Sequence, residues 1–180
     1  MRHRIRPIRP SDKEAVHNLL GRIAIFEPHE VQVARELIGE SLAGSPDYVI
    51  HVAENDDSEP ATSGVPAHVI GYVCHGHNPV TDALYDLYWI AVDPAMQGLG
   101  VGRALLAHAE ACVRETGGRG VVIDTSSRSE YAPARALYER SGYSLVAKIP
   151  DYYKPGDALL IYTKMLWAAA TLSSYSPLTR

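Results

Sequence analysis

Hydrophobic residues recur along this chain with two spacings, one typical of strands and one typical of helices. Alternating or continuous apolar runs predict strands at 48–54, 68–77, 85–92, 120–126, 143–149 and 158–166, and a proline-containing edge strand within 4–10. Apolar residues three and four apart predict helices at about 11–23, 30–42, 102–113 and 131–142. Because strands and helices alternate without an internal repeat or a linker, we expect one α/β domain.

The boundaries of this domain follow from the same pattern. We expect a single domain over residues 1–167 and a peripheral C-terminal extension over 168–180. The polar segment 55–67, rich in turn-forming residues, is expected to be a hairpin loop between two strands. The alternating Arg2, Arg4 and Arg6 are expected to protect the exposed edge of the first strand as solvated side chains.

Composition narrows the class of protein. With 17 Lys and Arg against 21 Asp and Glu, the chain is mildly acidic, so nucleic acid is not expected as a partner. Two cysteines are too few for a disulfide framework, which indicates a reducing compartment. Since no run of about 18 apolar residues occurs, we expect no membrane partner and a cytoplasmic protein.

Three glycines at alternate positions, Gly98, Gly100 and Gly102, precede the third predicted helix. Glycines that open a helix allow its backbone N–H groups to bind an anion. A nucleotide-hydrolysing P-loop is excluded, because Gly102 is followed by Arg103 and Ala104 where Lys and Ser or Thr are required. The glycines match the dinucleotide-binding motif better than the P-loop, and Asp124, about 20 residues further along, could be its ribose ligand. However, Arg103 stands where this motif requires its third glycine.

The residues that flank the glycines indicate a different phosphate-containing ligand. The stretch LYWIAVDPAMQGLGVGRALLAHAE resembles the acyl-CoA binding motif of the GNAT superfamily of N-acyltransferases, with Gln97, Gly100 and Gly102 at its signature positions. The resemblance implies a mostly antiparallel mixed sheet, splayed between strands 4 and 5, with helices on both faces. It also implies a binding site for acetyl-CoA. Its pyrophosphate would lie on the backbone of Gly98, Leu99, Gly100, Val101, Gly102 and Arg103, and its pantetheine on that of Ile90, Ala91 and Val92.

A second motif supplies a candidate acid. ARALYERSGY resembles the family's later helix motif, which makes Tyr138 the candidate general acid that protonates the leaving thiolate. The motifs are nearest to those of the enzymes that acetylate ribosomal-protein amino termini. Many family members carry an asparagine seven residues before this tyrosine. Tyr131 stands there in this chain, so Ser129, Glu130 and Tyr131 are the candidate replacements.

Asp124 is our first choice as the general base, because it ends a strand that the family splays open. The alternative is a carboxylate that fixes the following Ser-rich loop. Asp86 and Glu30 are further candidates, and a water chain could replace a direct base. The same reading implies direct attack of the amine on the thioester, without a covalent enzyme intermediate.

The acceptor is expected to be a small-molecule or peptide amine, with the acidic and aromatic segment 151–157 as its binding loop between the last two strands. The resemblance also allows a homodimer. We expect no metal, because the CHGH segment at 74–77 places only two imidazoles on one face of its strand. Two alternatives to the enzyme are kept: a non-catalytic coenzyme A binding module and a dinucleotide-dependent oxidoreductase.

Overall fold

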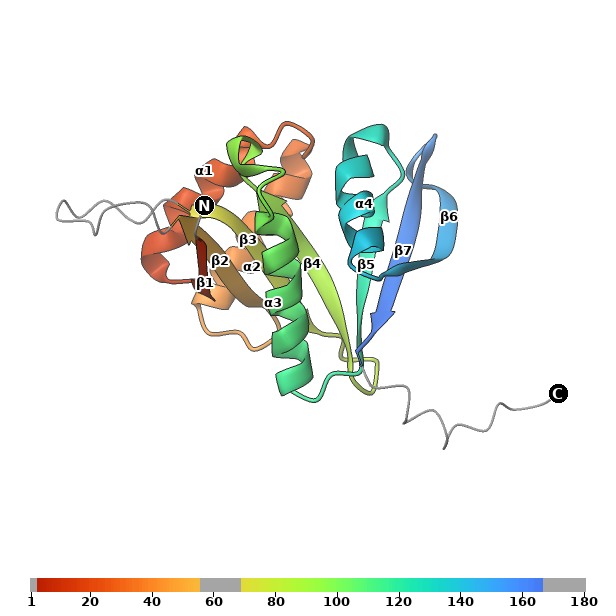
Figure 1. Ribbon diagram of the computed structural model, residues 1–180. Coiled ribbons are helices and arrows are strands. Elements are labelled where there is room, and N and C mark those ends of the chain that lie inside the picture. Colours follow the sequence, from red (N-terminus) through yellow and green to blue (C-terminus); the bar gives the residue numbers. More distant parts are fainter. Residues whose placement is uncertain (1–2, 56–68, 167–180) are drawn as a thin grey trace.

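The computed structural model describes residues 3–55 and 69–166. Most of the predicted loop 55–67, the predicted extension 168–180 and Arg2 lie outside these residues. The described strands form one seven-stranded sheet in the order β1-β2-β3-β4-β5-β7-β6 (Figure 1). They are β1 His3–Pro7, β2 Val49–Asn55, β3 Val69–His77, β4 Leu84–Val92, β5 Gly120–Ser126, β6 Ser144–Lys154 and β7 Asp157–Met165.

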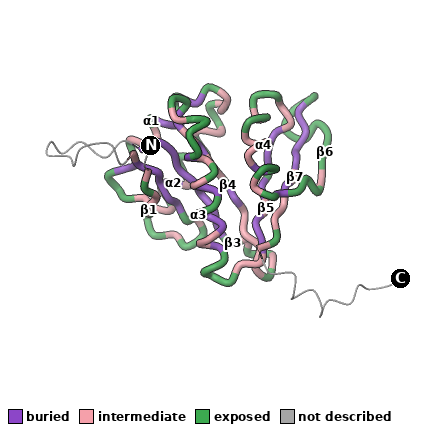
Figure 2. The backbone as a smooth tube through the Cα atoms, in the orientation of Figure 1, coloured by how far each residue is buried: buried purple, intermediate pink, exposed green. Residues whose placement is uncertain are grey.

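Helices cover both faces of the sheet. They are α1 Lys13–Arg22, α2 Pro28–Leu42, α3 Val101–Glu115 and α4 Ala132–Arg140. One core joins α1 and α2 to the sheet through residues such as Leu19, Ile38 and Tyr72, and the other joins α3 and α4 to the opposite face through Leu105 and Tyr138. Figure 2 shows the buried strands running between these helical layers. Among the described helices, none has the length and apolar character needed to cross a bilayer.

The sheet is splayed between β4 and β5. These strands are parallel and are paired only from Leu84 with Gly120 to Asp86 with Val122, whereas β5 pairs with β7 along its whole length. The register of β3 with β4 shifts at Cys74 and His75, which leaves Tyr88 as an extra residue on β4. Figure 1 shows the two halves of the sheet diverging beyond the paired segment. The predicted mixed, mostly antiparallel and splayed sheet is therefore confirmed.

Two local predictions are wrong. The side chain of Arg6 is only 10% exposed and forms ion pairs with Asp12 at 2.6 Å and Glu54 at 2.8 Å, so it is a buried cation and not a solvated edge residue. Arg4, with 61% of its side chain exposed, also pairs with Glu54. Residues of the predicted acceptor loop up to Lys154 belong to β6, and a turn at Pro155 and Gly156 alone separates β6 from β7.

Candidate active site

The start of α3 is built by glycines in a left-handed backbone conformation. Gly98 has φ +77° and Gly100, the N-cap of α3, has φ +86°. A Cβ atom on either glycine would meet nothing within 4 Å, so glycine is needed here for the backbone conformation and not for space. The first N–H groups of a helix have no intrahelical acceptor and carry the positive end of its dipole, so this turn can hold an anionic group such as a pyrophosphate.

Gly102 has a different role in the same turn. A Cβ atom there would lie 3.3 Å from Leu137 Cδ2 of α4 and 3.5 Å from Val92 Cγ2 of β4. The missing side chain therefore lets α4 and the end of β4 approach the start of α3. Gln97 follows β4 and its Nε2 donates a hydrogen bond of 3.4 Å to the carbonyl of Val92. Leu99 and Arg103 are exposed around this turn.

The end of β4 offers free backbone groups to the splay. The N–H of Asp93 donates to the carbonyl of Ile70 at 2.9 Å, so backbone groups at alternate residues of β4 face β3. By this alternation Ala91 is bonded within the sheet, opposite Tyr72. Ile90 and Val92 direct their N–H and C=O groups to the open side, where β5 has diverged. Of these groups, the C=O of Val92 already accepts the hydrogen bond from Gln97 Nε2. Of the three residues predicted to contact pantetheine, these two present the required groups.

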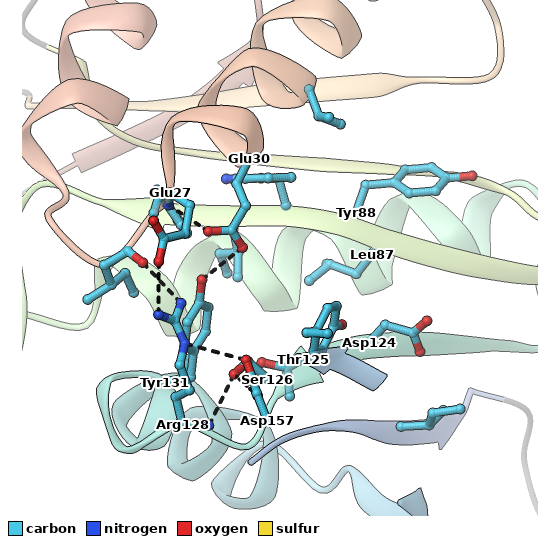
Figure 3. A pocket seen from close by; sticks show the side chains of 18 of the residues that line it. Glu27, Glu30, Leu87, Tyr88, Asp124, Thr125, Ser126, Arg128, Tyr131 and Asp157 are labelled. Atoms are coloured by element: carbon cyan, nitrogen blue, oxygen red, sulfur yellow. Dashed lines mark hydrogen bonds and ion pairs between the residues drawn. The ribbon is translucent and has the colours of Figure 1, made fainter. Parts of the chain in front are cut away.

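A cleft of about 730 Å³ lies along the splay and is lined by residues of α2, β4, β5, α4 and the β6–β7 hairpin (Figure 3). Aromatic side chains line it, among them Phe26, Tyr88 and Trp89. The ring of Phe26 packs against that of Trp89, with centroids 5.4 Å apart. The cleft therefore combines apolar walls with the acidic groups described next.

Tyr138 is the candidate acid and lies at the inner wall of this cleft. Its side chain is held by α4 between the rings of Tyr143 and Tyr162, with centroid distances of 6.2 Å and 5.9 Å. Burial raises the pKa of Tyr138 well above that of a free tyrosine. The phenol is thus protonated at neutral pH, as a general acid must be.

Asp124 on β5 is an uncommitted carboxylate in the cleft. Within the described part of the chain, no hydrogen bond or ion pair engages it. Burial raises its pKa, and the nearby charge of Asp86 raises it further. The alternative role that the sequence allowed, fixing the serine loop, belongs to Asp157, whose Oδ1 accepts a hydrogen bond of 2.6 Å from Ser126 Oγ.

The two further base candidates are already engaged. Asp86 accepts a hydrogen bond of 2.9 Å from Asn78 Nδ2, although burial still raises its pKa. Both oxygens of Glu30 are bonded, one by the backbone N–H of Glu27 at 2.7 Å and the other by Tyr131 Oη at 3.1 Å. Asp124 is therefore the carboxylate with the greatest freedom to take a proton.

Comparison with known proteins agrees with this geometry. Residues 46–145, more than half of the chain, match the family model of the acetyltransferase (GNAT) domain. The chain belongs to the GNAT family. A GNAT-family protein from Desulfovibrio desulfuricans has a crystal structure that matches this GNAT domain with a TM-score of 0.81 and 38% identity, over 92% of this chain and 100% of that chain.

Other relatives match this GNAT chain less completely. Blasticidin-S acetyltransferase from Streptomyces morookaense is 42% identical over 81 residues, which are 45% of this chain and 55% of the relative. The matches span only 20% to 55% of the length of the curated relatives. The ribosomal-protein-S18-alanine N-acetyltransferase from Escherichia coli shares the fold, with a TM-score of 0.72 and 19% identity over 93% of this chain and 96% of that chain.

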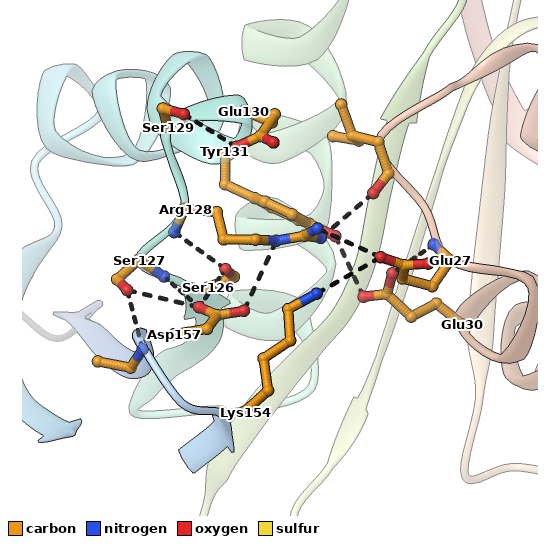
Figure 4. A network of polar contacts seen from close by, with 12 residues as sticks. Glu27, Glu30, Ser126, Ser127, Arg128, Ser129, Glu130, Tyr131, Lys154 and Asp157 are labelled. Atoms are coloured by element: carbon orange, nitrogen blue, oxygen red, sulfur yellow. Dashed lines mark hydrogen bonds and ion pairs between the residues drawn. The ribbon is translucent and has the colours of Figure 1, made fainter. Parts of the chain in front are cut away.

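This GNAT domain also contains a polar network that the sequence did not predict (Figure 4). Arg128, which follows β5, forms ion pairs with Glu27 at 3.4 Å and Asp157 at 3.6 Å, and its guanidinium lies 5.1 Å from the centroid of the Tyr131 ring. Lys154 pairs with Glu27 at 3.6 Å. Segments about 100 residues apart in sequence meet here, so no local motif could have revealed the network.

Proposed function

We propose that this chain is an N-acetyltransferase that transfers the acetyl group of acetyl-CoA to a primary amine in a ternary complex. The observation that carries the proposal is the left-handed glycine turn at the start of α3, directly beside the unpaired edge of β4. The turn offers N–H donors to a pyrophosphate, and Ile90 and Val92 offer strand-like hydrogen bonds to the pantetheine amides. The names of curated relatives, which include acetyltransferases, support the same activity.

Different residues of the cleft carry out the two proton transfers of the reaction. The acceptor amine loses a proton, which Asp124 takes directly or through water, and its nitrogen attacks the thioester carbonyl. The C–S bond then breaks, and Tyr138 gives its proton to the departing thiolate. Positioning supplies much of the rate, because both reactants are held in one cleft. No metal is needed for these steps.

We infer that the acceptor is a cationic amine, either a small molecule or the amino terminus of a peptide. Asp86 and Asp124 bring negative charge to the cleft, and the phenols of Tyr88 and Tyr153 lie beside them. Burial, followed by the charge of Asp86, raises the pKa of Tyr88 to about 12. Burial, followed by the charge of Asp124, raises that of Tyr153 to about 12. An ammonium group is favoured by carboxylates and aromatic faces together.

The test is release of free thiol from acetyl-CoA in the presence of a panel of amines, with peptides, polyamines, amino acids and aminoglycosides as separate members. Amine-dependent release above the hydrolysis rate is expected. A coenzyme A binding module would bind acetyl-CoA and release no thiol with any amine. An oxidoreductase would gain thermal stability from NAD and none from acetyl-CoA.

Two further expectations stay predictions. A homodimer is supported by β6, an edge strand with exposed apolar side chains at Leu145, Val146 and Ile149. The cytoplasmic location rests on the composition of the sequence. Sedimentation of the purified chain tests the first, and fractionation of cells tests the second.

A further inference from the structure

A group of metal-ligating side chains lies outside the cleft, on the face of the sheet that α3 covers. His51 of β2 and His108 and Cys112 of α3 place one donor atom each within 4.8 Å of one another. None of the three lines the cleft. His108 is seven residues along α3 from its first residue, which places it about 10 Å from the glycine turn.

The distance between two of these donors matches that of a tetrahedral zinc site. Cys112 Sγ lies 3.6 Å from His108 Nε2, one helical turn away. Bonds of about 2.0 Å to nitrogen and 2.3 Å to sulfur at a tetrahedral angle separate the two ligand atoms by about 3.5 Å. The ring of His51 meets that of His108 edge-on, with centroids 4.4 Å apart, and one donor atom of His51 lies within 4.8 Å of the donors of His108 and Cys112.

Buried imidazole nitrogens without partners provide independent support. His51 is 8% exposed and His75 of β3 is 2% exposed, and their rings stack at 6.3 Å. Neither Nδ1 of His51 nor either ring nitrogen of His75 has a hydrogen-bond partner among the residues that the structure describes. A buried polar nitrogen without a partner is unfavourable and calls for a ligand.

Metal binding sets the protonation state of each ligand. A histidine binds a metal ion through a neutral imidazole and a cysteine through a thiolate, so the Cys112 thiol must lose its proton when an ion binds.

We propose that His51, His108 and Cys112 bind one Zn²⁺ ion, with a fourth coordination position next to His75. Two nitrogens and one thiolate are the donors that zinc prefers. Binding forms two Zn–N bonds and one Zn–S bond, and the thiol proton passes to solvent without any redox change. The ion would join β2 to α3 and so stabilise the fold, apart from the acyl transfer.

This site differs from the CHGH segment that the sequence offered. Cys74 packs in the core under α1 and α2, on the opposite face of the sheet from His75. The ligands that the local sequence lacked come instead from β2 and α3, which only the fold brings together.

The first test is titration of the chelator-stripped protein with Co²⁺, a spectroscopic substitute for zinc. We expect saturation at one equivalent, with a thiolate-to-cobalt charge-transfer band and intense visible bands of a tetrahedral site. One equivalent of Zn²⁺ should remove these bands and raise the Tm.

Cys112→Ser should lose the charge-transfer band, and His108→Gln should weaken Co²⁺ binding at least tenfold. His77→Gln, on the same strand as His75 but exposed, is the matched control and should bind like the wild type.

X-ray absorption of the zinc-loaded wild type makes the test independent of the folding of any variant. One sulfur at about 2.3 Å and nitrogens at about 2.0 Å are expected around the metal. A shell of nitrogen and oxygen alone, or a charge-transfer band that survives in Cys112→Ser, would overturn the proposal.

Discussion

Tyr131 Oη donates a hydrogen bond of 3.1 Å to Glu30 Oε1 and so joins the start of α4 to the start of α2 across the cleft. These elements belong to the two halves of the sheet that diverge beyond Asp86 and Val122. The hydrogen bond from Arg128 Nη1 to Glu27 Oε1, at 3.4 Å, is a second contact between the same two parts of the chain (Figure 4). Tyr131 thus bridges the two halves of the site.

The bridge predicts coupling between its two residues. Tyr131→Phe and Glu30→Gln should each lower the free energy of unfolding by about 1 kcal/mol and raise the KM of the acceptor amine. The double variant should lose less than the sum of the two, because one bond is removed in both single variants. Urea unfolding of all four proteins measures the coupling energy. Strict additivity would show that the bond contributes nothing in solution.

Tyr138→Phe is expected to lower kcat by about 10²- to 10⁴-fold with little change in the Kd of acetyl-CoA, because only the proton donor is removed. Tyr143→Phe is the matched control, since that neighbouring ring lies outside the lining of the cleft. Steady-state kinetics and acetyl-CoA titration supply both quantities. If kcat is the same in both variants, another group protonates the thiolate.

Asp124→Asn should lower kcat/KM by about 10²-fold or more if the carboxylate acts as the base. Because the pKa of Asp124 is raised, the wild-type kcat/KM should rise with pH through a value above the ordinary aspartate pKa of about 4. The variant should lack this step. A water chain as the base would leave the profile unchanged in the variant.

The raised pKa of Asp124 also makes the stability of the folded protein depend on pH. A raised folded-state pKa means that the folded protein binds this proton more tightly than the unfolded chain does. The stabilisation is complete below the ordinary pKa and is lost as the pH rises through the folded-state value. Asp124→Asn should therefore have the higher Tm at pH 7 to 8, and the difference should vanish below about pH 4. Thermal unfolding across this range checks the sign.

Gly100→Ala is expected to lower the free energy of unfolding by about 1 kcal/mol, because alanine is strained at φ +86°. It should also weaken acetyl-CoA binding, since the first N–H groups of α3 would change direction. Gly21→Ala is the control: Gly21 lies inside α1 with nothing near its Cβ position, so alanine should stabilise the protein by about 0.5 to 1 kcal/mol. Equal effects of the two substitutions would contradict the role of the left-handed turn.

Arg6→Met should destabilise the protein by about 3 kcal/mol at pH 7, because it leaves the buried carboxylates of Asp12 and Glu54 without this cation. Burial raises the pKa of both acids, but the hydrogen bonds from arginine outweigh it and the net shift is downward. Their stabilisation is therefore present above the ordinary pKa and is lost as the pH falls through the lowered values. The gap between variant and wild type should narrow toward pH 3. Arg4→Met, at the exposed end of the network, should cost about 1 kcal/mol or less.

Contiguous patterns predicted most of the fold. The apolar runs located β2, β3 and β5 to within a residue at each end, and α2 begins at Pro28, two residues before its predicted start, because proline suits the first helical turn. The length of β6 could not be predicted. Nearly all its residues are exposed. Because no face of the strand is buried, its last five residues show no alternation of apolar and polar positions.

The candidate site likewise has a part that the sequence predicted and a part that it did not. The glycine turn and Tyr138 each lie within a short motif, and the structure places both beside the splay. The Arg128 and Glu27 pair joins residues 101 positions apart, and the three proposed zinc ligands come from β2 and α3. Such groups depend on topology, because each residue by itself looks like an ordinary surface or core position.

The short pairing of β4 with β5 has one more consequence. A sheet normally has unpaired hydrogen-bonding groups only along its two outer strands, where they invite association with other chains. Here Ile90, and Val92 through its N–H, present such groups in the middle of the sheet, sheltered between two layers of helices. A ligand with amide groups spaced like a peptide can complete the hydrogen bonding that the protein's own strands leave unfinished. The molecule thus keeps an internal strand edge, which lies between helices and not at the outer border of the sheet.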